Sequence, residues 1–209
     1  MGISVKDSKL AELGRLISDW PGLVSGPPDA LIEDCLVLLD HLGDARTLVD
    51  VGSGGGLPGI PLKIARPELA VTLVEADQAK AAFLVQACSR LDLRGVEVVA
   101  VRAEEAGRDA RHREAFDVAV ARALAPMPVL VELCLPFVKV GGRLLAQKTD
   151  KEEVSDAGRA IELCGGGAPR TVLAPSAARA GGTVVIVPKM RPTPDAYPRR
   201  AGVPSRKPL

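Results

Sequence analysis

The sequence predicts an α/β fold: a mostly parallel sheet with helices on both faces that ends in an antiparallel hairpin. From residue 47 onward, short runs rich in valine and leucine alternate with longer amphipathic or polar segments. Such alternation is typical of βαβ units, which produce parallel strands. The hydrophobic runs are almost continuous, as expected for strands that are buried on both faces.

Two helices are expected before the sheet. Hydrophobic residues recur at helical spacing in "LAELGRLISDW" and again in "ALIEDCLVLLDHLG", which ends at a glycine. The stretch between them, "PGLVSGPPD", is rich in turn-forming residues. We therefore assign residues 1–46 to an N-terminal helical segment.

Seven strands are expected over residues 47–190. The first five are "TLVDVG", "AVTLVEA", "VEVVAVRA", "FDVAVARA" and "GRLLAQK". After the helix-like "KEEVSDAGRAIELCGGG", the last two runs, "RTVLAP" and "GGTVVIVPK", are separated by a short loop that has no room for a crossover helix, so they must close antiparallel. This Rossmann-like arrangement is the shape of class I methyltransferases that use S-adenosylmethionine, and it differs from the six-stranded dinucleotide-binding fold.

Composition limits the class of protein. The 209 residues suit one globular domain, and no stretch is long and hydrophobic enough to cross a membrane, so we expect a cytoplasmic protein. The four cysteines are far apart and there are two histidines, so no metal site is expected. Residues 191–209 form a basic tail. Counted from Lys189, the last 21 residues carry a net charge of +5, against +1 for the whole chain. This charge suggests a polyanionic partner, and a solvated tail without a partner explains it equally well.

The stretch "DVGSGGGLPG" joins the end of the first strand to a glycine-rich loop. Gly52, Gly54 and Gly56 allow a tight turn and a close approach to a ligand, and Pro58 can open the next helix. Asp50 would place a carboxylate at the strand end, where it can hold an ammonium group. S-adenosylmethionine carries such a group, whereas NAD offers a pyrophosphate, so the stretch favours S-adenosylmethionine.

The next strands also end in residues that suit a nucleoside. Glu75, about 20 residues after the loop, can accept hydrogen bonds from the ribose hydroxyls of an adenosine. Ala103 and Glu104 would flank an adenine ring, although Glu104 equally suits a helix N-terminus. Arg122 and Lys148 stand at the carboxyl ends of the fourth and fifth strands, where open α/β sheets bind ligands, or they pair with neighbouring acids.

Several segments together resemble the GidB or RsmG family of small-subunit ribosomal RNA guanine-N7 methyltransferases. They are "DVGSGGGLPGIPLKIARPELAVTLVEADQAKAAFL", "VRAEE", "FDVAVARALAPM" and the closing "YPRRAGVPSRKPL". The resemblance implies methyl transfer from S-adenosylmethionine to N7 of a guanine in 16S ribosomal RNA, guanine 527 in that family. It implies 16S rRNA or the small ribosomal subunit as partner, and neither a membrane nor a metal.

The resemblance also assigns residues. The positions that match the family's S-adenosylmethionine site are Gly52, Leu57, Ala103, Glu104 and Arg122. The basic positions that match its RNA-facing residues are Arg102, Arg122, Lys148, Arg199 and Arg200. No residue is expected to act as a general base, because guanine N7 offers a lone pair and loses no proton.

Upstream of the sheet, the sequence departs from the family's usual pattern. Trp20 is followed by Pro21, Leu31 replaces a histidine, and a motif that usually reads Asp-Ser-Leu is "EDCL" here. Two alternatives therefore stay open: a relative that binds cofactor or RNA with lost or altered activity, and an NAD-dependent oxidoreductase. The closing hairpin, Asp50 and the lack of a catalytic histidine near the strand ends argue against the second.

Overall fold

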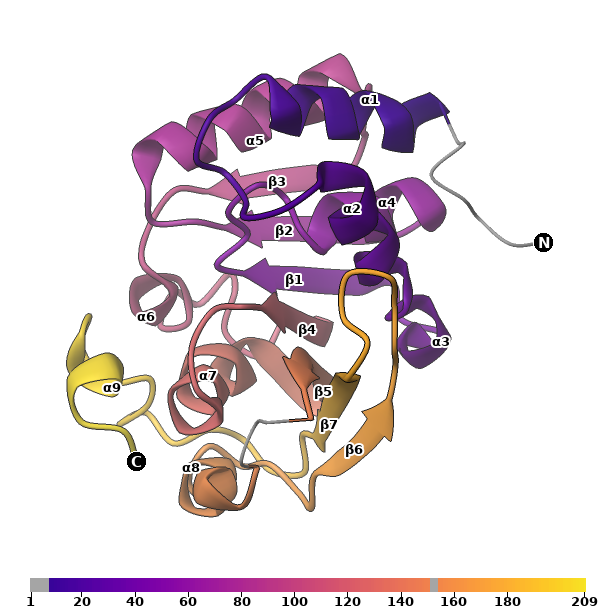
Figure 1. Ribbon diagram of the computed structural model, residues 1–209. Coiled ribbons are helices and arrows are strands. Elements are labelled where there is room, and N and C mark those ends of the chain that lie inside the picture. The colour runs from indigo at the N-terminus through magenta and orange to yellow at the C-terminus, as the bar shows by residue number, and fades with distance from the viewer. Residues whose placement is uncertain (1–7, 151–153) are drawn as a thin grey trace.

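The computed structural model describes residues 8–150 and 154–209, whose strands form a seven-stranded sheet in the order β3-β2-β1-β4-β5-β7-β6 (Figure 1). The strands are β1 (Thr47–Val51), β2 (Ala70–Val74), β3 (Val96–Val99), β4 (Phe116–Arg122), β5 (Val138–Thr149), β6 (Arg170–Leu173) and β7 (Gly182–Pro188). Strands β1 to β5 pair in parallel, and β7 pairs antiparallel with both β5 and β6. The predicted sheet and its closing hairpin are confirmed.

Helices cover both faces of the sheet (Figure 1). They are α1 (Ser8–Ser18), α2 (Pro28–Leu36), α3 (Leu39–Leu42), α4 (Gly59–Ala65), α5 (Gln78–Arg90), α6 (Ala103–Ala106), α7 (Met127–Cys134), α8 (Gly158–Leu163) and α9 (Val203–Arg206). Side chains of α1 to α5 pack on one face, and those of α6 to α8 pack on the other. Residues 151–153, the start of the helix expected before the hairpin, lie outside the described residues.

The single helix expected over residues 30–43 is instead two helices. The amide of Leu38 donates to the carbonyl of Cys35 at 3.2 Å, a tighter i to i−3 bond that interrupts the α-helical ladder between α2 and α3. Hydrophobic periodicity is the same on both sides of this break, so the sequence pattern did not reveal it.

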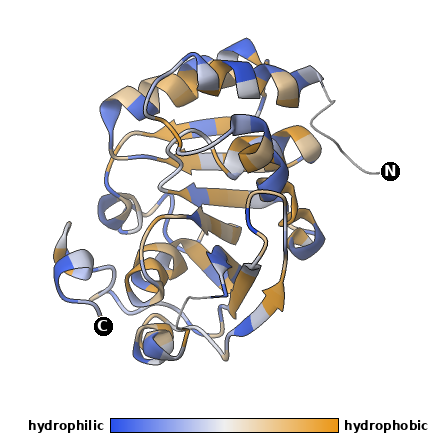
Figure 2. Ribbon diagram, viewed as in Figure 1, coloured by the Kyte–Doolittle hydropathy of each residue, from blue (hydrophilic) through white to orange (hydrophobic). Residues whose placement is uncertain are grey.

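The core has two layers, one on each face of the sheet. Along β1, Leu48 faces the layer of α1 to α5, and Val49 and Val51 face the layer of α6 to α8. All three are fully buried. Figure 2 shows the strands coloured mostly as hydrophobic, as expected for parallel strands covered on both faces.

The N-terminal segment, which departs from the family's pattern, packs on α5 and on the glycine-rich turn after β1. The rings of Trp20 and Phe83, on α5, meet edge to face with their centroids 5.5 Å apart. In the loop that follows, Val24 lies so close to Gly55 that a Cβ at position 55 would come within 3.0 Å of its Cγ1 atom. This loop therefore rests directly on the glycine-rich turn.

The basic C-terminal segment is folded against the body and is not a free solvated tail. Arg113 donates to the carbonyls of Thr193 and Tyr197 at 2.6 and 2.9 Å, and Arg108 donates to that of Pro198 at 2.7 Å. These bonds satisfy backbone groups of a segment that has little regular structure of its own.

One ion pair fixes this segment to α7. Glu132 is fully buried, and its carboxylate accepts from the Arg199 guanidinium at 2.8 and 2.6 Å and from the Arg199 amide at 2.8 Å. The side chain of Arg199 was predicted to face RNA; the structure instead commits it to a buried acid. Its neighbour Arg200 is exposed.

Replacing Arg199 with alanine is expected to destabilise the fold by about 3–5 kcal/mol, because Glu132 would remain buried without its counter-charge. The matched control is Arg200→Ala, whose free energy of unfolding should change by less than about 0.5 kcal/mol. Urea unfolding of both variants checks this. Equal stabilities would show that the pair does not fasten the tail.

Candidate functional site

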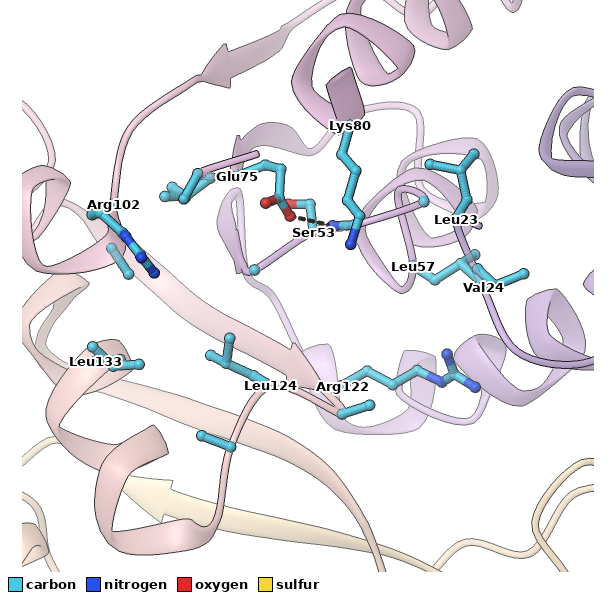
Figure 3. Close-up of a pocket in the computed structure, with 18 of the residues that line it drawn as sticks. Leu23, Val24, Ser53, Leu57, Glu75, Lys80, Arg102, Arg122, Leu124 and Leu133 are labelled. Carbon is cyan, nitrogen blue, oxygen red and sulfur yellow. Dashed lines mark hydrogen bonds between the residues drawn. The ribbon is translucent and has the colours of Figure 1, made fainter. Parts of the chain in front are cut away.

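A cavity of about 610 Å³ opens at the carboxyl ends of β1 to β4. Ligands of open α/β sheets bind at this edge. Figure 3 shows the side chains of Glu75 and Arg102 on one side of the cavity and that of Arg122 on another. The cavity is therefore the place where the predicted site residues should meet.

The glycines of the loop have different tasks. Gly52 and Gly54 line the cavity with positive φ angles of +74° and +53°. A Cβ at Gly54 would meet no protein atom closer than 3.9 Å, whereas one at Gly52 would lie 2.5 Å from Cδ1 of Leu124. A ligand can therefore approach the backbone of Gly54 closely, whereas the missing side chain of Gly52 leaves space for Leu124 in the cavity wall.

Gly56 does not line the cavity, contrary to prediction. A Cβ there would come within 2.4 Å of Cδ1 of Ile60 on α4, so glycine at this position serves helix packing. Leu57, the next residue, lines the cavity.

Glu75 lies at the cavity and holds the loop in place. One carboxylate oxygen accepts from the amide of Gly54 at 2.8 Å, and the other accepts from that of Asp77, also at 2.8 Å. Figure 3 shows the Glu75 side chain at the cavity with a dashed hydrogen bond. A carboxylate oxygen can accept a second hydrogen bond. Glu75 therefore retains the capacity to bind ligand hydroxyls.

Asp50 lies behind the loop and does not face the cavity, contrary to prediction. It is fully buried, and its Oδ2 atom accepts from the amide of Gly59, the first residue of α4, at 2.9 Å. Its Oδ1 atom has no hydrogen-bond partner among the described residues. Burial disfavours the charged carboxylate and raises its pKa to about 7, although the Gly59 amide opposes the shift.

Arg102, Ala103 and Glu104, in the segment after β3, all line the cavity; the sequence assigns Ala103 and Glu104 to the cofactor and Arg102 to RNA. Glu104 is 5% exposed, and its carboxylate accepts from the amide of Gly202, in the C-terminal segment, at 2.8 Å. Ser205, from α9, also lines the cavity. The C-terminal segment therefore forms part of the cavity rim.

Arg122 lines the cavity from the end of β4. It pairs neither with Glu75 nor with Glu104; its Nε atom lies 3.4 Å from Oδ2 of Asp34, on α2. The following residue, Ala123, has a φ of +51°, which is uncommon for alanine and turns the chain at this edge.

Lys148 lies near the cavity but does not line it. It is 9% exposed, and its Nζ atom donates to the carbonyl of Ala125, a wall residue, at 2.6 Å. The structure thus gives Lys148 a supporting position in place of the predicted substrate contact. Arg199 and Arg200 are not among the lining residues either.

The sequence does not single out the rest of the lining, which consists of Gly22, Leu23, Val24, Ser25, Ser53, Gly55, Val74, Ala76, Lys80, Val101, Ala123, Leu124, Ala125, Leu133 and Ser205. The turn-rich stretch after α1 is expected only to connect two helices, and its sequence carries no signal of a contact with the glycine-rich loop. Lys80 could have been predicted, because it lies in the first turn of the helix that follows Glu75 and therefore near the same strand end.

Within residues 8–150 and 154–209, no group of three or more histidine, cysteine, aspartate or glutamate side chains is placed to hold a metal ion. Over the same ranges, no helix has the length and hydrophobicity required to span a membrane.

Comparison with known families and relatives gives consistent matches. The GidB family model, described as rRNA small subunit methyltransferase G, matches residues 29–176. The ribosomal RNA small subunit methyltransferase G of Roseiflexus sp. (strain RS-1) is 49% identical over 173 residues, which cover 80% of this chain and 73% of the relative. That of Acetivibrio thermocellus is 45% identical over 195 residues, covering 86% and 80%.

Solved structures with low sequence identity share the fold. An O-methyltransferase from Streptomyces achromogenes in complex with SAM has a TM-score of 0.60 at 18% identity, covering 88% of this chain and 91% of that one. An O-methyltransferase from Bacillus cereus in complex with SAH has a TM-score of 0.61 at 19% identity, covering 88% and 92%. The predicted class I methyltransferase fold is confirmed.

The raised pKa of Asp50 predicts how stability depends on pH. Its folded-state pKa of about 7 exceeds the ordinary value of 3.8, so the folded protein binds this proton more tightly than the unfolded chain does. The stability gained from Asp50 is present below pH 3.8 and is lost as the pH rises to about 7. Asp50→Asn should remove this loss, on the order of a few kcal/mol across the window.

The measurement is the difference in free energy of unfolding between wild type and Asp50→Asn from about pH 4 to pH 8, by urea titration. As the pH rises, wild type should lose stability relative to Asp50→Asn, so the free energy of unfolding of the variant minus that of wild type should increase. Asp44→Asn, at an exposed position, is the control for the loss of one carboxylate. Parallel profiles for Asp50→Asn and wild type would contradict the inference.

Proposed function

This chain belongs to the GidB family of ribosomal RNA small subunit methyltransferases G, and from that premise we propose that it methylates N7 of one guanine in 16S ribosomal RNA. The observation that carries the proposal is the cavity at the strand ends, since most of its lining falls within the matched residues 29–176. The family assignment removes the NAD-dependent oxidoreductase alternative.

The residues at the cavity fit S-adenosylmethionine. The bare backbone at Gly54 leaves space that a Cβ would fill, and Glu75 keeps acceptor capacity for ribose hydroxyls. Ala103 and Glu104 would border the adenine, and Arg122 offers a cation to the carboxylate of the amino acid. Gly52 and Leu57 complete the loop side of the site.

S-adenosylmethionine supplies a methyl group activated on a sulfonium, which transfers by in-line displacement. The chain's own task is to orient the guanine and to exclude water. Leu23, Val24 and Leu124 place hydrophobic side chains at the cavity and serve the second task. No general base is required, because N7 attacks with a lone pair and carries no proton.

We place the RNA at the rim formed by the segment after β3 and the C-terminal segment. Arg102 is exposed at the cavity, and Arg200, Arg206 and Lys207 are exposed near Ser205. Arginine and lysine bind phosphates by charge, and arginine can also bind O6 of guanine. The partner is then 16S rRNA, free or within the small ribosomal subunit, in the cytoplasm.

The function is tested by methylation of small ribosomal subunits, and of bare 16S rRNA, from a strain that lacks this protein. The purified chain with labelled S-adenosylmethionine should methylate a single guanine at N7, mapped by chemical cleavage at the modified base. Transfer to another atom or to no RNA would overturn the proposal and would favour a relative with altered or lost activity.

Gly54→Ala is expected to weaken S-adenosylmethionine binding by roughly tenfold or more, because its Cβ would occupy the cavity. The control is Gly141→Ala: Gly141 has a φ of +88°, has no atom within 4 Å of the added Cβ, and lies away from this cavity. Both variants bear the strain of a positive φ, about 1 kcal/mol. Calorimetry should therefore show lost affinity only for Gly54→Ala, and unchanged affinity there would remove Gly54 from the site.

A further inference from the structure

We propose that Asp34 is a positioning residue that fixes Arg122 at the cavity wall, while Arg179 balances the charge of Asp34 so that Arg122 stays available to a ligand. The inference rests on the proposed function of the cavity. It concerns residues on α2 and on the loop between β6 and β7, neither of which lines the cavity.

The carboxylate of Asp34 is fully buried and densely hydrogen-bonded. Arg179 Nε lies 2.9 Å from each carboxylate oxygen, and the Ser176 hydroxyl donates to Oδ1 at 2.6 Å. Arg122 Nε approaches Oδ2 at 3.4 Å. A buried carboxylate needs such partners, because an unpaired charge in the interior is costly.

The distances decide which arginine neutralises Asp34. Arg179 contacts both oxygens at short range and is 13% exposed, whereas Arg122 contacts one oxygen at the limit of a hydrogen bond. One carboxylate and two guanidinium groups have a net charge of +1. Because Arg179 lies closer to Asp34 than Arg122 does, Arg179 neutralises the carboxylate and the remaining positive charge is that of Arg122. A carboxylate paired with Arg122 alone would largely cancel that charge.

The orientation of Arg122 follows from the same contact. Its Nε is directed to Asp34, and its two terminal nitrogens have no hydrogen-bond partner within the described part of the chain. A guanidinium is planar, so fixing Nε restricts the plane in which the terminal nitrogens point. They form the fork that binds carboxylates and phosphates with two bonds.

The anchor itself is fixed from several elements. Gln147, at the end of β5, donates to the Asp34 carbonyl at 2.8 Å. Arg179 Nη1 donates to the carbonyls of Lys148 and Thr183, so the hairpin loop is tied to β5 and β7. Neighbouring strands therefore set the position of Asp34, and through it the position of Arg122.

The test is a double-mutant cycle with Asp34→Asn and Arg122→Gln, singly and together, in the full chain. The readouts are kcat and KM for methylation of unmodified small ribosomal subunits, and the thermal unfolding midpoint. Arg122→Gln and Asp34→Asn should each lower kcat/KM about tenfold or more, and the double variant should match Arg122→Gln within about twofold. Glu33→Gln, an exposed neighbour on α2, should leave kcat/KM unchanged.

The cycle separates the inference from the function on which it rests. If Arg122→Gln retains full activity, the assigned role of Arg122 fails. Two outcomes would overturn the positioning role alone while Arg122→Gln is impaired. In the first, Asp34→Asn leaves kcat/KM unchanged; in the second, Asp34→Asn lowers kcat/KM by the same factor in the wild-type and in the Arg122→Gln background. Should Asp34→Asn fail to fold, Ser176→Ala replaces it: a loss of about threefold, absent in the Arg122→Gln background, supports the inference, and any other pattern overturns it.

Discussion

The cavity depends on the way in which neighbouring strands hold the loop after β1. Glu75, the residue after β2, accepts from the amide of Gly54, and the amides of Gly52 and Ser53 donate to the carbonyl of Val74 at 2.9 and 3.0 Å. From behind, Asp50 accepts from the first amide of α4. A glycine-rich loop has high conformational freedom when unfolded, so these bonds must offset a large loss of entropy. They keep the loop open toward the ligand side.

The fold was predictable because its signals are local. Each strand is a short run of branched hydrophobic residues. The loop between β6 and β7 is too short for a crossover helix, which is enough to predict that these two strands pair antiparallel. Strand-end residues such as Glu75 and Arg122 followed from topology, since parallel strands bring their carboxyl ends to one edge. Failures came where side-chain direction decides: Asp50 stands at that edge but bonds to α4 behind the loop, and Lys148 bonds to the wall residue Ala125 without lining the cavity.

Distant partners account for the remaining errors, and they concern charged residues above all. Arg199 and Arg200 are adjacent in sequence, yet one is committed to buried Glu132 and the other is exposed. The partner lies 67 positions away, so no local pattern distinguishes the two arginines. For Arg122 the partner on α2 is 88 positions away. Whether a basic residue serves the fold or a ligand is thus decided by tertiary contacts with acids.

The C-terminal segment illustrates how these contacts join the two halves of the activity. Glu104 touches the cavity and also accepts from Gly202, so a ligand that shifts Glu104 acts on the segment that carries Arg206 and Lys207. Arg199 holds the same segment on α7, which limits the movement available to it. The C-terminal segment is thus held at Arg199 by α7 and is bonded at Gly202 to Glu104 of the cavity. These two contacts connect the cavity to the surface proposed for RNA. If cofactor binding shifts Glu104, linkage requires that RNA docking at this rim changes the affinity for the cofactor by the same factor.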